Sequence, residues 1–155
     1  MLIFKALHIL SMFVMVTIFS GGELFYALAI QARDVRALAW LHRTERRFGI
    51  AFVALGALIA GVIFGLLTAL TGGFDVLDGW LIAAYVLVAL FFVNSAIFAR
   101  ATIQLADRAV EADAGQLSVE EVVREMAASN RAVILFIVNA TIFGLIIVDM
   151  VLKPF

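Results

Sequence analysis

The sequence contains no cysteine, a single proline and few charged residues. The absence of cysteine excludes disulfides, iron–sulfur clusters and thiolate zinc sites, but it leaves open haem iron with nitrogen or thioether ligands. Charged residues make up 15% of the chain, 11 basic against 12 acidic, which argues against a nucleic-acid partner because such proteins carry a strong basic excess. The chain is 65% hydrophobic, more than a soluble domain of 155 residues can bury. The composition therefore predicts an integral membrane protein.

Four apolar segments are long enough to cross the hydrocarbon core, which takes about 20 residues of helix. They cover about residues 2–30, 48–70, 80–98 and 132–152. The first segment begins behind almost no basic region and is longer than the apolar part of a signal peptide, so we expect it to be retained. We predict an all-α fold, an antiparallel four-helix transmembrane bundle that forms one domain over residues 1–155.

Positive charge is concentrated in two of the three connections between these segments. Nine of the eleven lysines and arginines lie in residues 31–47 and 99–131, and the connection 71–79 has none. Because cytoplasmic loops of membrane proteins carry an excess of these residues, both arginine-rich connections should be cytoplasmic. We therefore expect a multi-pass protein of the bacterial inner membrane, with both termini on the outer side and the lipid bilayer as its immediate partner.

The longest connection should be largely helical. Residues up to Ala114 favour helix, Gly115 is a helix stop, and Ser118 with Glu121 has the pattern of a capping box that starts a new helix. The last two helices are therefore predicted over about 80–114 and 119–152, with a cytoplasmic helical hairpin over about 99–131. The connection 31–47 is expected to be a loop in which His42 is solvated.

Polar side chains inside a membrane are costly and mark candidate sites. At about 1.5 Å rise per residue, His8, Asp149 and Met150 fall at similar depth near the outer face. A neutral imidazole can bind a metal such as haem iron, and Met150, from another helix, could complete the coordination. The alternative is an interfacial histidine that bonds to Asp149 or to a backbone carbonyl, with the methionine as a packing residue.

A second polar layer lies toward the cytoplasmic face. Glu23, Asn94 and Asn139, from three different helices, fall at one depth. A carboxyl group there could transfer protons or bind an ion, whereas the amides could equally hold helices together. The layer fits a small transporter or ion-coupling protein, and four short helices would perform that function most readily as a homodimer.

Small residues recur at every fourth position of the second segment, at Ala57, Gly61 and Gly65. This spacing allows another helix to approach closely. The partner helix belongs either to the same bundle or to a second copy of the chain, and the spacing does not distinguish the two. A groove for a cofactor is a third interpretation.

The first 50 residues resemble a known group of membrane proteins. Lys5-Ala-Leu-His8-Ile-Leu, followed by Gly21-Gly22-Glu-Leu-Phe-Tyr26, is similar to the first helix of HemJ-type protoporphyrinogen oxidases and of CopD-like proteins, and Glu45-Arg-Arg-Phe48 to their second-helix entry. The resemblance implies that His8 binds haem b. The Leu-Pro-Arg segment and the third-helix lysine of the HemJ family are absent, so it does not extend to the oxidase activity.

Three functions therefore stay open. The first is a haem-binding redox protein that uses His8 and Met150. The second is the transporter or ion-coupling protein that uses Glu23, Asn94 and Asn139. The third is a structural or assembly subunit of a membrane complex.

Overall fold

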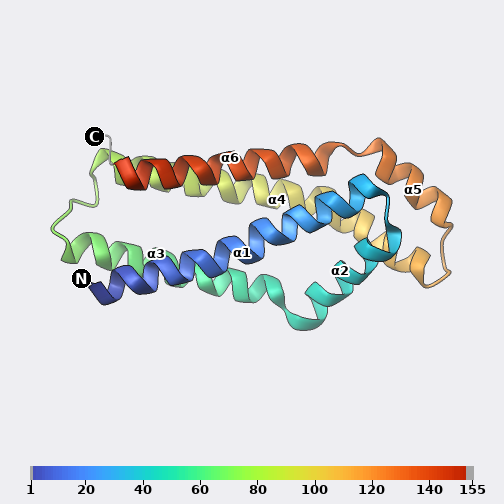
Figure 1. Ribbon diagram of the computed structural model, residues 1–155, viewed down its shortest axis with the longest axis horizontal. Coiled ribbons are helices and arrows are strands. Elements are labelled where there is room, and N and C mark those ends of the chain that lie inside the picture. Colours follow the sequence, from blue (N-terminus) through green and yellow to red (C-terminus); the bar gives the residue numbers. More distant parts are fainter. Residues whose placement is uncertain (1, 153–155) are drawn as a thin grey trace.

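The apolar segments form long helices in the computed structural model, which describes residues 2–152. Within that range the elements are α1 (Leu2–Ala32), α2 (Val35–Phe48), α3 (Ile50–Thr71), α4 (Gly79–Asp113), α5 (Val119–Ala128) and α6 (Arg131–Leu152), as Figure 1 shows. Four of them, α1, α3, α4 and α6, are long and apolar enough to cross a membrane. The predicted all-α membrane bundle is confirmed.

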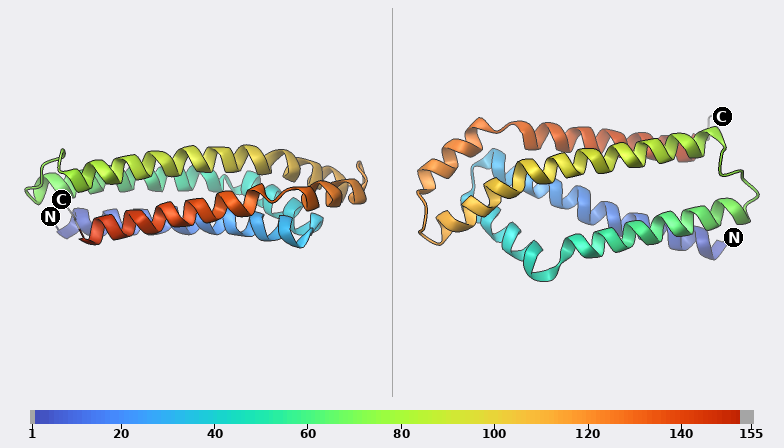
Figure 2. Two further views of the ribbon diagram at one scale, coloured as in Figure 1. Left: turned by 90° about the horizontal axis from the view of Figure 1, so that it is seen from above. Right: turned by 180° about the vertical axis from the view of Figure 1, so that it is seen from behind.

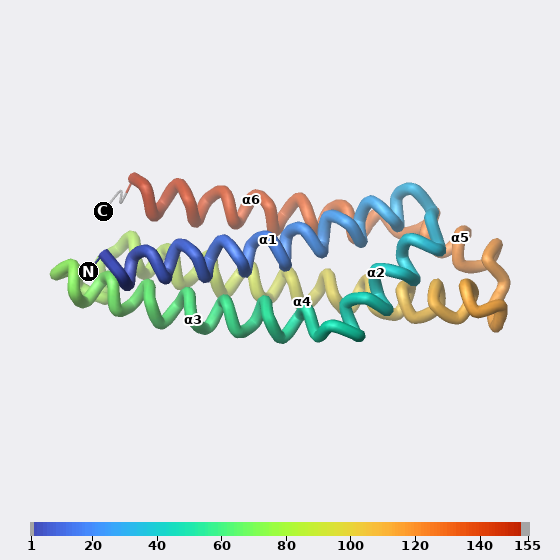
Figure 3. Tube along the Cα trace, turned by 60° about the horizontal axis from the view of Figure 1, so that its bottom comes forward, coloured from blue at the N-terminus to red at the C-terminus, as the bar shows by residue number. Residues whose placement is uncertain are grey.

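The four long helices run antiparallel in chain order. The start of α1, the connection between α3 and α4 and the end of α6 lie at one end of the molecule, and α2 and α5 lie at the other (Figures 1 and 2). We call the second end the arginine-rich end. Helix α1 packs mainly against α3, and α4 packs against α6, so the bundle consists of two helix pairs that meet where α1 contacts α6 (Figure 3).

The best-packed part of the protein lies at the arginine-rich end. A cluster of buried side chains from α1, α2, α4, α5 and α6 fills it; its larger members are Tyr26, Ile30, Leu38, Phe98, Leu105, Val122 and Met126. By contrast, large apolar side chains such as Phe13, Ile59, Leu90 and Ile147 are exposed along the long helices. Those outward surfaces suit a hydrocarbon environment, and the buried cluster holds the helices together beyond it.

The first connection is a helix rather than the expected loop. Asp34 caps the start of α2 by accepting a hydrogen bond from the backbone of Ala37 at 2.9 Å. The inner face of α2 includes Leu38, which is 0% exposed. Gly49, at φ 60°, ends α2 in the left-handed conformation that favours glycine, and α3 starts immediately after it. Because this segment carries many charged residues, its average composition does not show the narrow apolar stripe along one face of the helix.

The last helical segment is divided, where one helix over 119–152 was predicted. The chain leaves helical geometry at Ser129, with φ −106° and ψ 89°, and α6 starts at Arg131. Serine and asparagine compete with helical hydrogen bonds through their side chains, and they occupy this break. The bend lets α5 lie against α4. The start of α5 after Ser118 agrees with the prediction, although the Ser118 side chain makes no capping bond.

Candidate functional site

Three long helices contribute polar side chains to one buried network inside the bundle. The amide nitrogen of Asn139 on α6 lies 2.8 Å from both carboxyl oxygens of Glu23 on α1 and 2.8 Å from the Ser95 hydroxyl on α4. Asn94, the neighbour of Ser95, donates to the Asn139 side-chain oxygen and to the Leu135 carbonyl, both at 2.8 Å. The structure thus brings together Glu23, Asn94 and Asn139, and it adds Ser95.

This network is enclosed, and it contains a carboxyl group without a basic partner. Glu23 is 6% exposed and Asn139 is 1% exposed. Asn139 stands eight residues after Arg131, about 12 Å into the span at the usual helical rise. No ion pair of residues 2–152 involves Glu23. Because an unpaired carboxylate is costly in such surroundings, a proton or a small cation would neutralise this group favourably.

A second network lies at the arginine-rich end, one helical turn from the first. The Tyr26 hydroxyl donates to Glu45 at 2.7 Å and lies 3.1 Å from Nδ1 of His42. Nε2 of His42 lies 2.9 Å from an Asp107 oxygen, and Arg46 lies 3.7 Å from the same oxygen. Four titratable side chains from α1, α2 and α4 are therefore joined in one row of contacts: Asp107, His42, Tyr26 and Glu45.

The second network reaches from the interior to solvent. The His42 side chain is 8% exposed and that of Asp107 is 48% exposed. His42, Glu45 and Asp107 line a pocket of about 520 Å³, whose apolar wall includes Phe52 and Ile103. The expectation that His42 is solvated is wrong, because α2 turns it toward α1 and α4.

On the opposite side of Glu23 the bundle is filled by apolar side chains. Met15, Leu58 and Phe91, from α1, α3 and α4, form a buried cluster with Phe19 and Ile142 packed against it. Ser20, one turn from Glu23 on this side, has a buried hydroxyl oxygen without a hydrogen-bond partner in the described chain. The polar network around Glu23 thus has the second network beyond it toward the arginine-rich end and an apolar layer in the other direction.

His8 lies in the contact between α1 and α3. Its Nδ1 is 2.7 Å from the Gly61 carbonyl oxygen, and a Cβ added at Gly65 would lie 2.9 Å from the ring. A Cβ at Gly61 would lie 2.7 Å from the Met12 sulfur. Gly61 and Gly65 therefore allow α1 to approach α3 within one chain, and Ala57 borders the apolar cluster one turn away. The small residues line an internal contact of the bundle.

The other residues predicted for the outer layer lie on a different helix pair. Met150 packs against Ala69, Trp80 and Leu81, and the end of α6 diverges from the start of α1 in Figure 1. Asp149 is buried, and one of its oxygens has no hydrogen-bond partner in the described chain. Among residues 2–152, no group of three or more histidine, aspartate and glutamate side chains is arranged to hold a metal ion.

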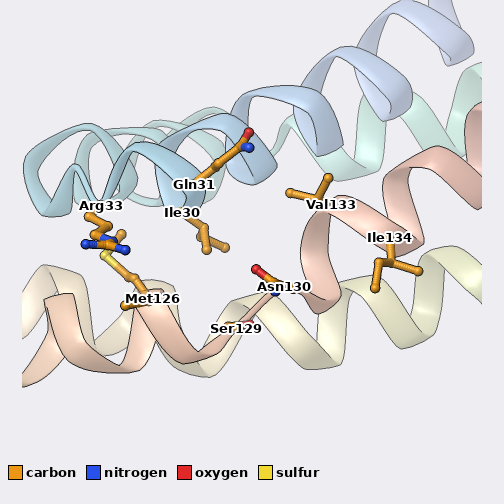
Figure 4. Close-up of a pocket in the computed structure, with 9 residues that line it drawn as sticks. Ile30, Gln31, Arg33, Met126, Ser129, Asn130, Val133 and Ile134 are labelled. Carbon is orange, nitrogen blue, oxygen red and sulfur yellow. The ribbon is translucent and has the colours of Figure 1, made fainter.

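A further pocket, of about 410 Å³, lies where the chain bends between α5 and α6 (Figure 4). Ile30 and Arg33, at the end of α1, face Met126, Asn130 and Val133 across it. Arg33 adopts φ 55°, an unusual conformation for a residue other than glycine, where α1 ends. None of the predicted polar residues lines this pocket.

Sequence reasoning missed the second network because its members look unrelated along the chain. Tyr26 is part of an apolar segment, and His42 and Glu45 stand among five arginines. Their common location depends on α2 folding back between α1 and α4, as Figure 3 shows. A helical reading of residues 35–48 would have placed His42 one turn after Leu38 and Ala39, on the apolar face.

Comparison with known proteins supports the membrane assignment and adds no activity. Neither the curated proteins nor the solved structures include a match to this chain. A family model described as a predicted integral membrane protein, DUF2269, matches residues 2–154, and that range includes all four long helices and both polar networks. The chain therefore belongs to the DUF2269 family of predicted integral membrane proteins.

Proposed function

We propose that this integral membrane protein is a small transporter or ion-coupling protein in which Glu23 binds and releases a proton or a small cation. The observation that carries the proposal is the buried Glu23 carboxyl, held by Asn139 from another helix and free of any basic partner among residues 2–152. A carboxyl that served only to hold helices together would be a costly choice, since an amide can do so without a charge.

The arrangement of helices supports this role. The network joins α1 to α4 and α6, so a change in the charge of Glu23 changes hydrogen bonds between the two helix pairs. Asn139 can present its oxygen or its nitrogen to a partner and so can serve either charge state of the carboxyl. Coupling of ion binding to a relative movement of the two pairs is the simplest mechanism for transport, and a homodimer would supply a larger pathway than four helices alone.

Proton flux into liposomes tests the proposal. The purified protein is reconstituted with a pH-sensitive dye inside, and a pH gradient is imposed. We expect faster equilibration than in empty liposomes, and we expect Glu23→Gln to return the rate to the empty level. Glu120→Gln, on the exposed surface of α5, is the matched control. Equal rates for Glu23→Gln and the unmodified protein would refute the assignment.

The orientation in the membrane is a separate proposal. The arginine-rich end lies in the cytoplasm of a bacterial inner membrane, with both termini outside, because lysine and arginine concentrate on the side that is not translocated. The chain has no cysteine, so single cysteines can report exposure without background. A cysteine at Leu77 should react with an impermeant maleimide in intact cells, and a cysteine at Gln116 should react only after lysis. The reverse pattern would invert the topology.

Haem b binding through His8 is the second candidate. Its support is the 2.7 Å contact of Nδ1 with the Gly61 carbonyl, since metal-binding histidines commonly hold one ring nitrogen in this way and present the other. Met150 packs against the cluster of Ala69 on α3 and Trp80 and Leu81 on α4, so of the two predicted haem ligands only His8 lies in the α1–α3 contact. A Soret band that is lost in His8→Ala would support it, and protein without haem after expression in haem-replete cells would exclude it.

A further inference from the structure

We propose that Tyr26, His42 and Asp107 form the proton path between Glu23 and the pocket at the arginine-rich end. The inference rests on the proposed function, because it assumes that Glu23 takes up and releases a proton. It assigns a role to the second network, and it names the side of the membrane from which the proton is exchanged. The path runs from the half-exposed Asp107 through the buried His42 to the Tyr26 hydroxyl.

Two contacts make most of this path continuous, and a third links it to Glu45. Asp107 lies 2.9 Å from His42 Nε2, His42 Nδ1 lies 3.1 Å from the Tyr26 hydroxyl, and that hydroxyl lies 2.7 Å from Glu45. Tyr26 and Glu23 stand three residues apart on α1, so their Cβ atoms are about 5–6 Å apart on one face. Water between the Tyr26 hydroxyl and the Glu23 carboxyl would complete the path, since a bridging water takes the place of a direct hydrogen bond between two polar groups.

The donors and acceptors allow a proton to shift without a net change of charge. In one arrangement His42 carries both ring protons and donates to Asp107 and to the Tyr26 oxygen, while Tyr26 donates to ionised Glu45. In the other, the Nδ1 proton has moved to the Tyr26 oxygen, and the original hydroxyl proton has moved to Glu45. One N–H and one O–H bond break, two O–H bonds form, and His42 and Glu45 both become neutral.

Tyr26 is the branch point of the path. Its hydroxyl can donate toward Glu45, as in the structure, or rotate and donate through water toward Glu23. The charged and titratable groups that face His42 are Glu45 and Arg46 of its own helix, Tyr26 of α1 and Asp107 of α4. Glu45 can therefore hold a proton next to the Tyr26 hydroxyl, which passes protons on toward Glu23.

The surroundings favour exchange from this end. The pocket of about 520 Å³ opens beside His42, Glu45 and Asp107, whereas the apolar cluster around Met15 and Phe91 lies on the other side of Glu23. A purely structural role for the second network would explain the packing of α2 against α1 and α4. It would not require a buried histidine between a tyrosine and a half-exposed carboxylate, because an amide satisfies the same two partners.

Hydrogen–deuterium exchange of the Glu23 carboxyl tests the path. The protein is placed in lipid nanodiscs, and the carbonyl stretch of the protonated carboxyl is followed by infrared spectroscopy after transfer to D₂O. Loss of the band in Glu23→Gln assigns it to Glu23. We expect Tyr26→Phe, which removes only the hydroxyl, to slow the exchange by about 100-fold, the lower end of what a positioned acid–base group contributes to proton transfer. His42→Phe should have the same effect.

The control is a tyrosine outside the path. Tyr85→Phe, on the exposed surface of α4, should leave the exchange rate unchanged. If Tyr26→Phe or His42→Phe fails to fold, the half-exposed Asp107→Asn gives the same readout. Exchange at the unmodified rate in the folded path variants overturns the proton path. Absence of any Glu23-dependent carboxyl band across the pH range would overturn the proposed function instead.

Discussion

Replacing Asn139 by leucine should weaken the bundle by a predictable amount, because Asn139 is the only residue of the buried network that contacts its other three polar side chains. It is 1% exposed and bonds to Glu23, Ser95 and Asn94. A hydrogen bond between membrane helices contributes on average about 0.6 kcal/mol. Three lost contacts therefore amount to about 2 kcal/mol, and leucine leaves no cavity because its side chain has the same branching and the same number of heavy atoms as that of asparagine.

A double-mutant cycle with Glu23→Leu separates the pairwise contribution from the general cost of the substitution. After Asn139→Leu, Glu23 loses the amide that bonds to both of its oxygens. Removing Glu23 as well eliminates that unsatisfied acceptor, so the double variant should be less destabilised than the sum of the single variants by about 1 kcal/mol or more. The free energy of unfolding is measured by titration with a denaturing detergent in mixed micelles.

The control for this cycle is Thr141→Val on the same helix. Among residues 2–152 the Thr141 hydroxyl bonds only to the Ile137 carbonyl of its own helix, at 2.9 Å, and Thr141 is exposed. This substitution should change stability by less than about 0.5 kcal/mol. Additive effects of Asn139→Leu and Glu23→Leu would show that the two side chains do not interact, and the reasoning on the polar network would then be wrong.

Further predictions concern helix packing. Gly65→Ala places a Cβ 2.9 Å from the His8 ring and should destabilise the protein by about 1–3 kcal/mol, whereas Gly56→Ala, with no atom within 4 Å, should be neutral or stabilising in the same detergent titration. Leu38→Ala should cost about 2–5 kcal/mol because Leu38 is 0% exposed, and Trp40→Ala on the exposed side of α2 should cost far less. In Asp34→Ala the loss of the α2 cap should cost about 1 kcal/mol, measured in the same way. Equal effects within any matched pair would contradict the packing described above.

Much of the fold could be predicted from the sequence because the bilayer imposes simple rules. Segments of about 20 apolar residues must be helical in hydrocarbon, and this places α1, α3, the first part of α4 and α6. Depth along these helices also placed Glu23, Asn94 and Asn139 at one level, and in the structure they are hydrogen-bonded. Along a straight helix, distance follows from residue number alone.

The errors in the fold lie outside the hydrocarbon, where those rules do not apply. Helix α2 depends on a cap at Asp34 and on a narrow apolar face that includes Leu38, and the arginines obscure both in any average over the segment. The break at Ser129 depends on α5, which packs its buried Val122 and Met126 against the rest of the buried cluster at the arginine-rich end. Rotation about the helix axis was also missing from the sequence argument, so Met150 was paired with His8 by depth, although it packs against Trp80.

The two polar networks give the bundle an asymmetry that helix packing alone does not require. Both lie toward the arginine-rich end of the molecule. The second joins the interior to the half-exposed carboxylate of Asp107 through His42. In the other direction from Glu23, side chains such as Met15 and Phe91 leave no comparable row of bonded titratable groups among the residues described. A bundle that needed polar contacts only for cohesion would gain as much from asparagine and serine, which carry no charge to bury. In the proposed transporter, the carboxyl at Glu23 and the proton donors beyond it would exchange protons with the compartment at the arginine-rich end, and access from the other compartment would require a movement of the two helix pairs.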